Sequence, residues 1–116
     1  MNDYKVTVIG AGPGGYTAAI RCAQFGFKTA LVEKYDKLGG TCLNVGCIPS
    51  KTLLDTSELF HQAKEKFNQH GISADNIRMD IGKMMTRKEK VIQQTGNGIK
   101  FLMKKNKLGE LILLEK

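Results

Sequence analysis

Two cysteines five positions apart are the residues of this chain best suited to chemistry. Cys42 and Cys47 lie in the segment GGTCLNVGCIPSK, residues 39–51. On an ideal helix, residues five apart are separated by a rise of about 7.5 Å, and a disulfide tolerates a Cα separation of about 7 Å at most. The two cysteines could bridge only if the helix were distorted. Three residue types in the segment distort helices: Asn44, Gly46 and Pro49.

Two other interpretations of these cysteines remain open on residue types alone. They could be unpaired core residues, or they could be two ligands of a zinc ion, although a structural zinc site needs about four ligands. Cys22 falls on an apolar helix stripe, where a small core residue is expected, and His61 and His70 lack ligand spacing. The sequence therefore disfavours zinc. A positive charge at Lys51, one helical turn after Cys47, would favour a thiolate.

A glycine-rich stretch near the N-terminus has the pattern of a dinucleotide-binding loop. The residues GAGPGG at positions 10–15 fit G-x-G-x-x-G. In this pattern Gly10 allows a tight turn, Gly12 lets the backbone approach a pyrophosphate, and Gly15 lets a helix pack closely on a strand. The phosphates then lie at a helix N-terminus, where free N–H groups favour negative charge. The alternative is an accidental glycine-rich turn.

Glu33 lies 18 residues after Gly15, at the end of the next expected strand. A carboxylate there can accept hydrogen bonds from the hydroxyl groups of an adenosine ribose. An acid rather than a base at this position argues against a nucleotide with a 2′-phosphate. The glycines, the strand, the helix and the acid together favour a dinucleotide site over an accidental turn.

The elements that must position these motifs begin with a strand, a helix and a strand. We expect a buried strand at 4–9, a helix at 14–25 that ends at Gly26, and a second strand at 28–33. Such a βαβ unit has parallel strands and a right-handed crossover. The sequence therefore predicts an α/β fold, with a partial Rossmann-like domain and a helical insertion.

The insertion is expected to contain three helical segments followed by a strand. An irregular helix covers 41–54, a second helix begins near Asp55 with Glu58 as its capping-box partner, and a long amphipathic helix follows Asp80. Gly96 and Gly98 should weaken this last helix midway, and 108–114 reads as a strand. The expected buried faces are Leu59, Phe60, Ala63 and Phe67 on the second helix, and Ile81, Met84, Met85, Val91, Ile92, Thr95, Ile99 and Leu102 on the third.

Length and composition bound the remaining possibilities. The 116 residues suffice for one domain, and 41% hydrophobic with 25% charged residues is typical of a globular protein. We find neither an apolar run long enough to cross a membrane nor a secretory signal. Three cysteines at uneven spacing differ from a secreted disulfide framework. The net charge of +7 is concentrated after position 82, where a solvated helix face is favoured over a nucleic-acid site.

The two motifs together resemble the flavin-dependent pyridine nucleotide–disulfide oxidoreductases, most closely the members that oxidise dihydrolipoamide. The resemblance covers residues 3–107 and implies that Cys42 and Cys47 form a redox-active disulfide. It implies that Cys42 exchanges with dihydrolipoamide and that Cys47 touches the flavin. The residues implied to bind FAD are Gly10, Gly12, Pro13, Gly14, Gly15, Glu33, Lys34, Gly39, Gly40, Thr41, Cys42 and Lys51.

The resemblance also implies the path of the electrons and the partners. Electrons pass from dihydrolipoamide to the disulfide, then to FAD, then to NAD⁺. The dihydrolipoamide is carried by the acyltransferase of a 2-oxoacid dehydrogenase complex or by the carrier of the glycine cleavage system, and the full-length enzymes are homodimers. The expected location is a bacterial cytoplasm, with the mitochondrial matrix as the alternative. Disulfide reductases of the glutathione or mercuric reductase type, and an inert flavin-binding remnant, are the competing interpretations.

The chain departs from the family in length and in one motif. Family members are several times longer, so residues 1–116 are expected to form the N-terminal part of an FAD-binding domain, without the NAD-binding and dimerisation domains. The family's acid–base histidine precedes a proline, whereas Pro13 and Pro49 each follow another residue type. The segment 108–116 also lacks the expected glycine-rich end.

Overall fold

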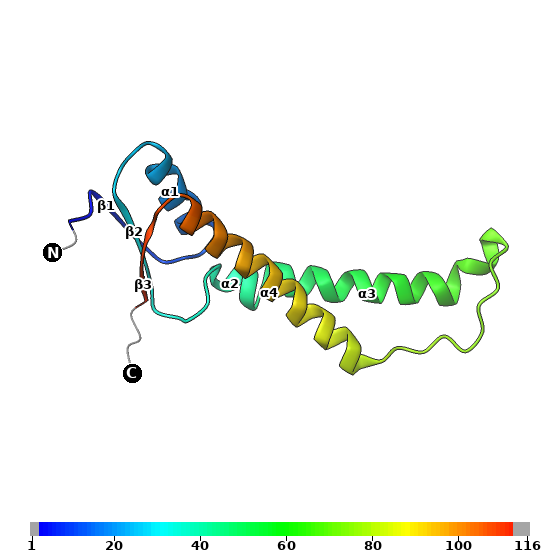
Figure 1. Cartoon of the computed structure of the whole chain (residues 1–116). Helices are drawn as coiled ribbons and strands as arrows, with labels where there is room; N and C mark the ends of the chain where they lie inside the picture. The colour runs from blue at the N-terminus through cyan, green and yellow to red at the C-terminus, as the bar shows by residue number, and fades with distance from the viewer. Residues whose placement is uncertain (1–2, 113–116) are drawn as a thin grey trace.

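Three parallel strands and four α-helices make up most of the structure, a computed structural model that describes residues 3–112. The strands pair in the order β1-β2-β3 (Figure 1). This arrangement confirms the α/β fold with a parallel βαβ unit. The elements are β1 (Val6–Ile9), α1 (Pro13–Gln24), β2 (Thr29–Glu33), α2 (Gly40–Asn44), α3 (Cys47–Glu65), the short 3₁₀ helix η1 (Phe67–His70), α4 (Ile81–Lys105) and β3 (Gly109–Ile112).

The helix of the βαβ unit, α1, ends just before Gly26, as the sequence predicts. Gly26 has a φ of +88°, its N–H donates to the Ala23 carbonyl, and the Phe27 N–H donates to the Cys22 carbonyl. These two bonds form a Schellman motif, which turns the chain back from α1 into β2. Leu31 of β2 is fully buried at the centre of the core. The core residues are Ala11, Ala19, Leu31, Leu38, Leu43, Ile99 and Met103.

The expectation that the first strand is buried is only half right. Side chains of β1 alternate between half-buried and exposed, and Ile9 is 85% exposed. Successive side chains of a strand point to opposite faces of the sheet, so one face of β1 is covered by the described residues and the other is open. The last strand, β3, spans Gly109–Ile112, and the expected positions 113 and 114 lie outside the described residues.

The helical insertion breaks at a different place from the one predicted. The break lies at Val45 and Gly46, and α3 then continues through Asp55 without interruption. Asp55 is therefore not a helix cap. Its carboxylate instead lies 3.0 Å from the Arg87 guanidinium, which also donates to the Thr52 carbonyl and so links α4 to α3. The predicted apolar face of α3 is also partly wrong, since Leu59 is 60% exposed.

The long helix α4 runs unbroken past both of its glycines. Asp80 caps it by accepting a hydrogen bond from the Lys83 N–H at 3.0 Å. Its buried residues are Ile92, Ile99 and Met103, whereas the predicted face included Ile81, Met85, Thr95 and Leu102, which are exposed. A Cβ on Gly96 would lie 3.8 Å from Leu43 of α2, an ordinary van der Waals contact, so the packing of the two helices does not require a glycine there.

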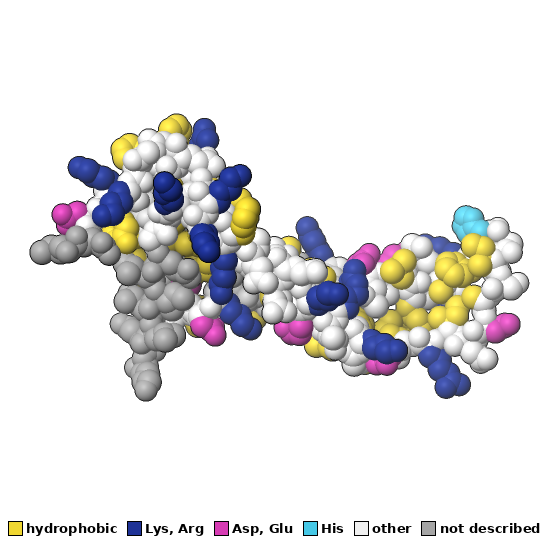
Figure 2. All heavy atoms as spheres, in the orientation of Figure 1, with side chains coloured by type: hydrophobic (Ala, Val, Ile, Leu, Met, Phe, Trp, Pro, Cys, Tyr) yellow, Lys and Arg dark blue, Asp and Glu magenta, His cyan; other side chains and the backbone are white. Residues whose placement is uncertain are grey.

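The molecule is elongated, because α3 and α4 project away from the sheet. The radius of gyration is 19.7 Å, against about 13 Å expected for a compact chain of this length. Figure 1 shows the sheet and α1 at one end and the turn between the long helices at the other. Hydrophobic side chains gather on the surface of that far end (Figure 2). Within residues 3–112, no helix has the length and apolar character needed to cross a membrane.

Candidate active site

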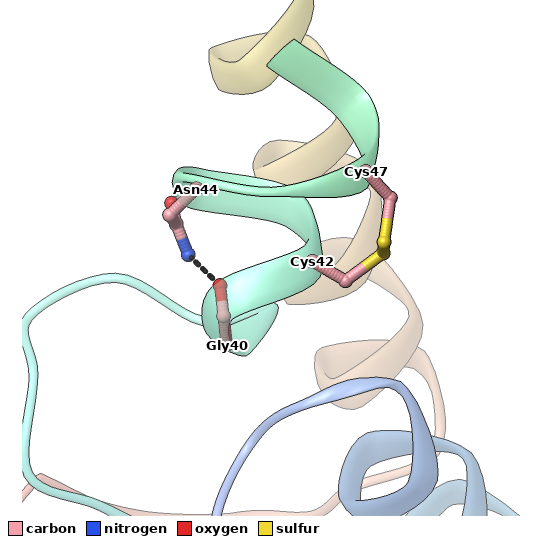
Figure 3. Close-up of a disulfide and its surroundings, with 4 residues drawn as sticks. All are labelled: Gly40, Cys42, Asn44 and Cys47. Carbon is pink, nitrogen blue, oxygen red and sulfur yellow. Dashed lines mark hydrogen bonds between the residues drawn. A yellow bond between two sulfur atoms is a disulfide. The ribbon is translucent and has the colours of Figure 1, made fainter. Parts of the chain in front are cut away.

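Cys42 and Cys47 form a disulfide at the junction of α2 and α3 (Figure 3). Their Cα atoms are 4.5 Å apart, well within the range that a disulfide allows. The pairing that the family resemblance implied is confirmed. Cys22 takes no part in it and lies half-buried on α1. Within the described residues, no cluster of three or more His, Cys, Asp or Glu side chains is arranged to hold a metal ion.

The break between α2 and α3 brings the two cysteines together. Pro49 cannot continue a helix from Val45, because it has no N–H to donate to the Val45 carbonyl. It lies instead in the first turn of α3, where that N–H is not needed. Gly46 lies so close to α2 that a Cβ there would be 3.0 Å from the Thr41 carbonyl oxygen and 3.4 Å from the Cα of Cys42.

The glycine-rich loop connects β1 to α1, as the motif predicts. Gly10 has a φ of +99°, a conformation that side chains disfavour, and a Cβ on Gly15 would overlap the Gly10 carbonyl. Gly12 is the N-cap of α1, and a Cβ there would meet no atom within 4 Å. The first N–H groups of α1 have no acceptor within the helix, and the first turn of α1 contains no acidic residue. This end of the helix therefore has free N–H donors of the kind that favour negative charge.

The two motifs contact each other directly. The Gly39 N–H donates to the Ala11 carbonyl at 2.8 Å. A Cβ on Gly40, whose φ is +61°, would lie 2.7 Å from the Cα of Gly12. Glycine at position 40 is therefore required for the close approach. As a result, the N-terminus of α2, which carries Cys42, lies beside the N-terminus of α1.

Glu33, at the end of β2, also contacts the glycine-rich loop. It is only 7% exposed, and its Oε2 accepts a hydrogen bond from the Ala11 N–H at 2.9 Å. Its Oε1 accepts from the N–H groups of Lys34 and Tyr35 at 2.8 and 3.2 Å. Desolvation raises the pKa of this carboxyl, but the three backbone hydrogen bonds outweigh it and hold the pKa below its usual value. The charged Glu33 carboxylate therefore stabilises the glycine-rich loop through its hydrogen bond to Ala11.

Cys47 and Lys51 share the electrostatic environment of the α3 N-terminus. Cys47 is the first residue of α3, where unpaired N–H groups stabilise a thiolate. Lys51 follows one turn later on the same face and is exposed. Cys47 is exposed and Cys42 is half-buried. The remaining predicted site residues, Pro13, Gly14, Lys34 and Thr41, lie at the N-termini of α1 and α2 and after β2, and Lys34 stacks on the Tyr35 ring.

Asn44 makes contacts that its residue type and position in the sequence did not predict. Its side-chain nitrogen donates to the carbonyls of Gly40 at 2.9 Å and Leu38 at 3.1 Å. The sequence indicated only that asparagine distorts a helix. A useful signal was the position of Asn44 four residues after Gly40, since a short polar side chain can fold back onto the carbonyl four residues earlier.

Comparison with known proteins agrees with this geometry. The family model described as pyridine nucleotide–disulphide oxidoreductase matches residues 4–110. A mitochondrial dihydrolipoyl dehydrogenase of Pisum sativum is 53% identical over 107 residues, which are 92% of this chain and 21% of that protein. A dihydrolipoyl dehydrogenase of Trypanosoma brucei brucei is 51% identical over 109 residues, 93% of this chain and 23% of the relative. A leghemoglobin reductase of Vigna unguiculata is 52% identical over 107 residues, 92% of this chain and 20% of that protein.

A solved structure has the same fold. It is a Cu(II) complex of a cysteine-to-serine mutant of the HOCl-induced flavoprotein disulfide reductase RclA from Escherichia coli, with a TM-score of 0.74 and 27% identity. The match covers 97% of this chain and 22% of that one. This chain thus spans about a fifth of the length of the relatives it matches. The motifs, their contact in space and the family match agree, and the chain belongs to the pyridine nucleotide–disulfide oxidoreductase family.

Proposed function

We propose that this chain carries the pyrophosphate-binding loop and the redox-active disulfide of a dihydrolipoyl dehydrogenase. One observation carries the proposal: the Cys42–Cys47 disulfide stands beside a glycine-rich helix N-terminus, held there by the Gly39–Ala11 hydrogen bond. The relatives named dihydrolipoyl dehydrogenase, about half identical to this chain, support the choice of substrate. The reaction is the oxidation of dihydrolipoamide to lipoamide with reduction of NAD⁺.

The residues present fit FAD. The first turn of α1 offers N–H donors and contains no acidic residue, and the open space beside Gly12 leaves room for a pyrophosphate. Gly10, Gly12, Pro13, Gly14 and Gly15 would hold it, together with the α2 N-terminus, where Gly39, Gly40, Thr41 and Cys42 lie. Glu33 and Lys34 would border the adenosine ribose, and Lys51 would lie toward the flavin. When bound, FAD would accept the electron pair of the reduced cysteines and pass it to NAD⁺.

The disulfide accepts electrons by thiol–disulfide exchange. One thiolate of dihydrolipoamide attacks the Cys42 sulfur, and the Cys42–Cys47 bond breaks with Cys47 leaving as a thiolate. The second thiol of the substrate then attacks the substrate's own sulfur in the mixed disulfide, the bond from that sulfur to Cys42 breaks, and Cys42 leaves as a thiol with the proton that the second thiol loses. The substrate is oxidised to lipoamide by two electrons, and both cysteines are reduced.

The position of Cys47 supports its role as the leaving thiolate. The α3 N-terminus and Lys51 both favour negative charge at this sulfur. Cys42 also lies in the first turn of a helix, but α2 has only five residues and the residue one turn after Cys42 is Gly46 rather than a lysine. Exposure does not support this division of roles, because Cys47 is the more exposed of the two. The roles rest on the charge argument and on the family resemblance.

The partners and location follow from the same resemblance. The dihydrolipoamide would be carried by the acyltransferase of a 2-oxoacid dehydrogenase complex or by the glycine cleavage carrier, and the complete enzyme would be a homodimer. Residues 1–116 would form the N-terminal part of its FAD-binding domain. A bacterial cytoplasm is proposed, or the mitochondrial matrix, which the mitochondrial relatives support. A leghemoglobin reductase is the second candidate, favoured by the relative of that name.

Gly12→Ala gives a sharp test of the flavin site. A methyl group at Gly12 meets no protein atom within 4 Å, so the variant should fold like the parent chain. The methyl group would obstruct a pyrophosphate at the loop, so FAD titration followed by flavin fluorescence should show weaker binding. Gly98→Ala, at another open position, is the control. Equal FAD affinity in the Gly12→Ala variant and the parent, or no FAD binding by the parent chain, would remove the proposed site.

A further inference from the structure

We infer that Asn44 is a positioning residue for the redox-active disulfide, and that its side-chain amide sets how readily Cys42 and Cys47 pair. The inference deepens the proposed function and rests on it for its meaning in electron transfer. Asn44 does not touch either sulfur. Figure 3 shows its amide on one side of α2, directed at Gly40, and the disulfide on the other.

The helix that carries Cys42 cannot be stable by itself. α2 has only five residues, and isolated helices shorter than about 12 residues are marginal in water. Outside support must therefore hold the Cys42 backbone in place. Asn44 supplies it by donating two hydrogen bonds from one nitrogen, to the Gly40 carbonyl at 2.9 Å and the Leu38 carbonyl at 3.1 Å.

These two bonds fix α2 to the segment that enters it. Leu38 is buried in the core, and the Gly39 N–H is bonded to the Ala11 carbonyl. The Asn44 amide therefore ties the last residue of α2 to a fixed point on the other side of Cys42. Cys47 is placed separately, by the N-terminus of α3.

Because these hydrogen bonds hold α2 in place, the effective concentration of the Cys42 thiol near the Cys47 thiol is higher. In the oxidised chain the Cα atoms of the two cysteines are 4.5 Å apart. A reduced chain that keeps this arrangement of α2 and α3 needs little further ordering to form the bond. Without the Asn44 amide, α2 would sample other conformations and Cys42 would spend less time near Cys47. The reduced dithiol would then be a weaker reductant toward an external disulfide.

The test is the equilibrium of the 116-residue chain with glutathione, in which two glutathione molecules reduce the disulfide to two thiols and form one oxidised glutathione. All proteins carry Cys22→Ser, so that only Cys42 and Cys47 exchange. We expect Asn44→Ala to shift the equilibrium toward the dithiol by about tenfold. Asn106→Ala is the matched control, because Asn106 also donates to the carbonyl four residues earlier, that of Leu102 at 2.7 Å, but at the C-terminus of α4 rather than in α2 or α3.

Comparison with the stability of the reduced chain separates positioning from general support. Urea unfolding of a chain that carries Cys42→Ser and Cys47→Ser measures how much Asn44→Ala lowers the free energy of unfolding without the disulfide. If Asn44 positions the cysteines, Asn44→Ala lowers this free energy by more in the oxidised chain with the disulfide. If Asn44→Ala does not fold, Asn44→Ser is compared in the same way. An unchanged glutathione equilibrium, or an equal shift in Asn106→Ala, would overturn the inference. A normal Asn44 effect in a chain that dihydrolipoamide cannot reduce would instead refute the proposed function alone.

Discussion

Among individual residues, Glu33 serves both the loop and the proposed ribose site. Its carboxylate already accepts hydrogen bonds from three backbone N–H groups. We expect Glu33→Ala to weaken FAD binding by about 1.5–3 kcal/mol, the value of a hydrogen bond to a charged group. Glu33→Gln should cost less, because one acceptor oxygen remains. Flavin titration measures both, and an FAD affinity of the Ala variant equal to that of the parent would exclude Glu33 from the nucleotide site.

The lowered pKa of Glu33 makes a second prediction, for stability against pH. Because the folded chain holds this pKa below its usual value of 4.5, the ionised carboxylate stabilises the fold. That contribution is complete above the unfolded pKa and is lost as the pH falls through the lower folded pKa. Urea unfolding of the parent and of Glu33→Gln should therefore differ most at neutral pH and converge in acid. The exposed Glu65→Gln is the control, and a gap that widens in acid would contradict the account.

The sequence indicated the glycines, the acid and the cysteines as candidate site residues because each has a strong local signature. It did not predict which backbone groups they contact. The bond from the Ala11 N–H to Glu33 spans 22 positions, and the one from Gly39 to Ala11 spans 28. Such contacts depend on the sheet register and on the path of a loop, which residue types alone do not specify.

Among the elements, the junction of α2 and α3 is the one on which the disulfide depends most. A methyl group in Gly46→Ala would press on the Thr41 carbonyl and the Cys42 backbone, so we expect destabilisation of about 1–3 kcal/mol and a weaker disulfide. Gly98→Ala, in the middle of α4 with open space around it, should instead stabilise by about 0.5–1 kcal/mol. Urea unfolding of both variants decides this, and a neutral Gly46→Ala would show that the close approach is dispensable.

The elements of the βαβ unit were predicted to within two residues at each end, while those of the insertion were not. The short β-branched runs mark β1 and β2 clearly, and Gly26 marks the end of α1. In the insertion, Asp55 followed by Glu58 has the form of a capping box, yet Asp55 pairs with Arg87 of α4 instead. The buried faces of α3 and α4 were also predicted incorrectly, again because of how the two helices pack. These helices pack against each other only along part of their length, so several apolar side chains on them stay exposed.

The whole molecule holds a disulfide and a candidate flavin loop at one end and an extended helix pair at the other. Repeated turnover also needs a nicotinamide site and an acid–base group, and general acid–base catalysis contributes roughly 10²–10⁴-fold. Neither proline of the sequence follows a histidine, so the family's acid–base motif is not among these 116 residues. We therefore expect this polypeptide alone to give no steady-state NADH formation from dihydrolipoamide. Turnover that is lost in Cys47→Ser would contradict this expectation.

The most direct test of the central claim is stoichiometric reduction of the disulfide by dihydrolipoamide. The oxidised Cys22→Ser chain is mixed anaerobically with dihydrolipoamide, alkylated, and examined by peptide mass spectrometry. We expect two new thiols per chain, at Cys42 and Cys47, with one lipoamide formed for each pair. Cys47→Ser, which cannot form the disulfide, should form no lipoamide. A disulfide that stays oxidised in excess dihydrolipoamide, while a small reductant such as dithiothreitol opens it, would contradict the claim that this site receives electrons from the substrate.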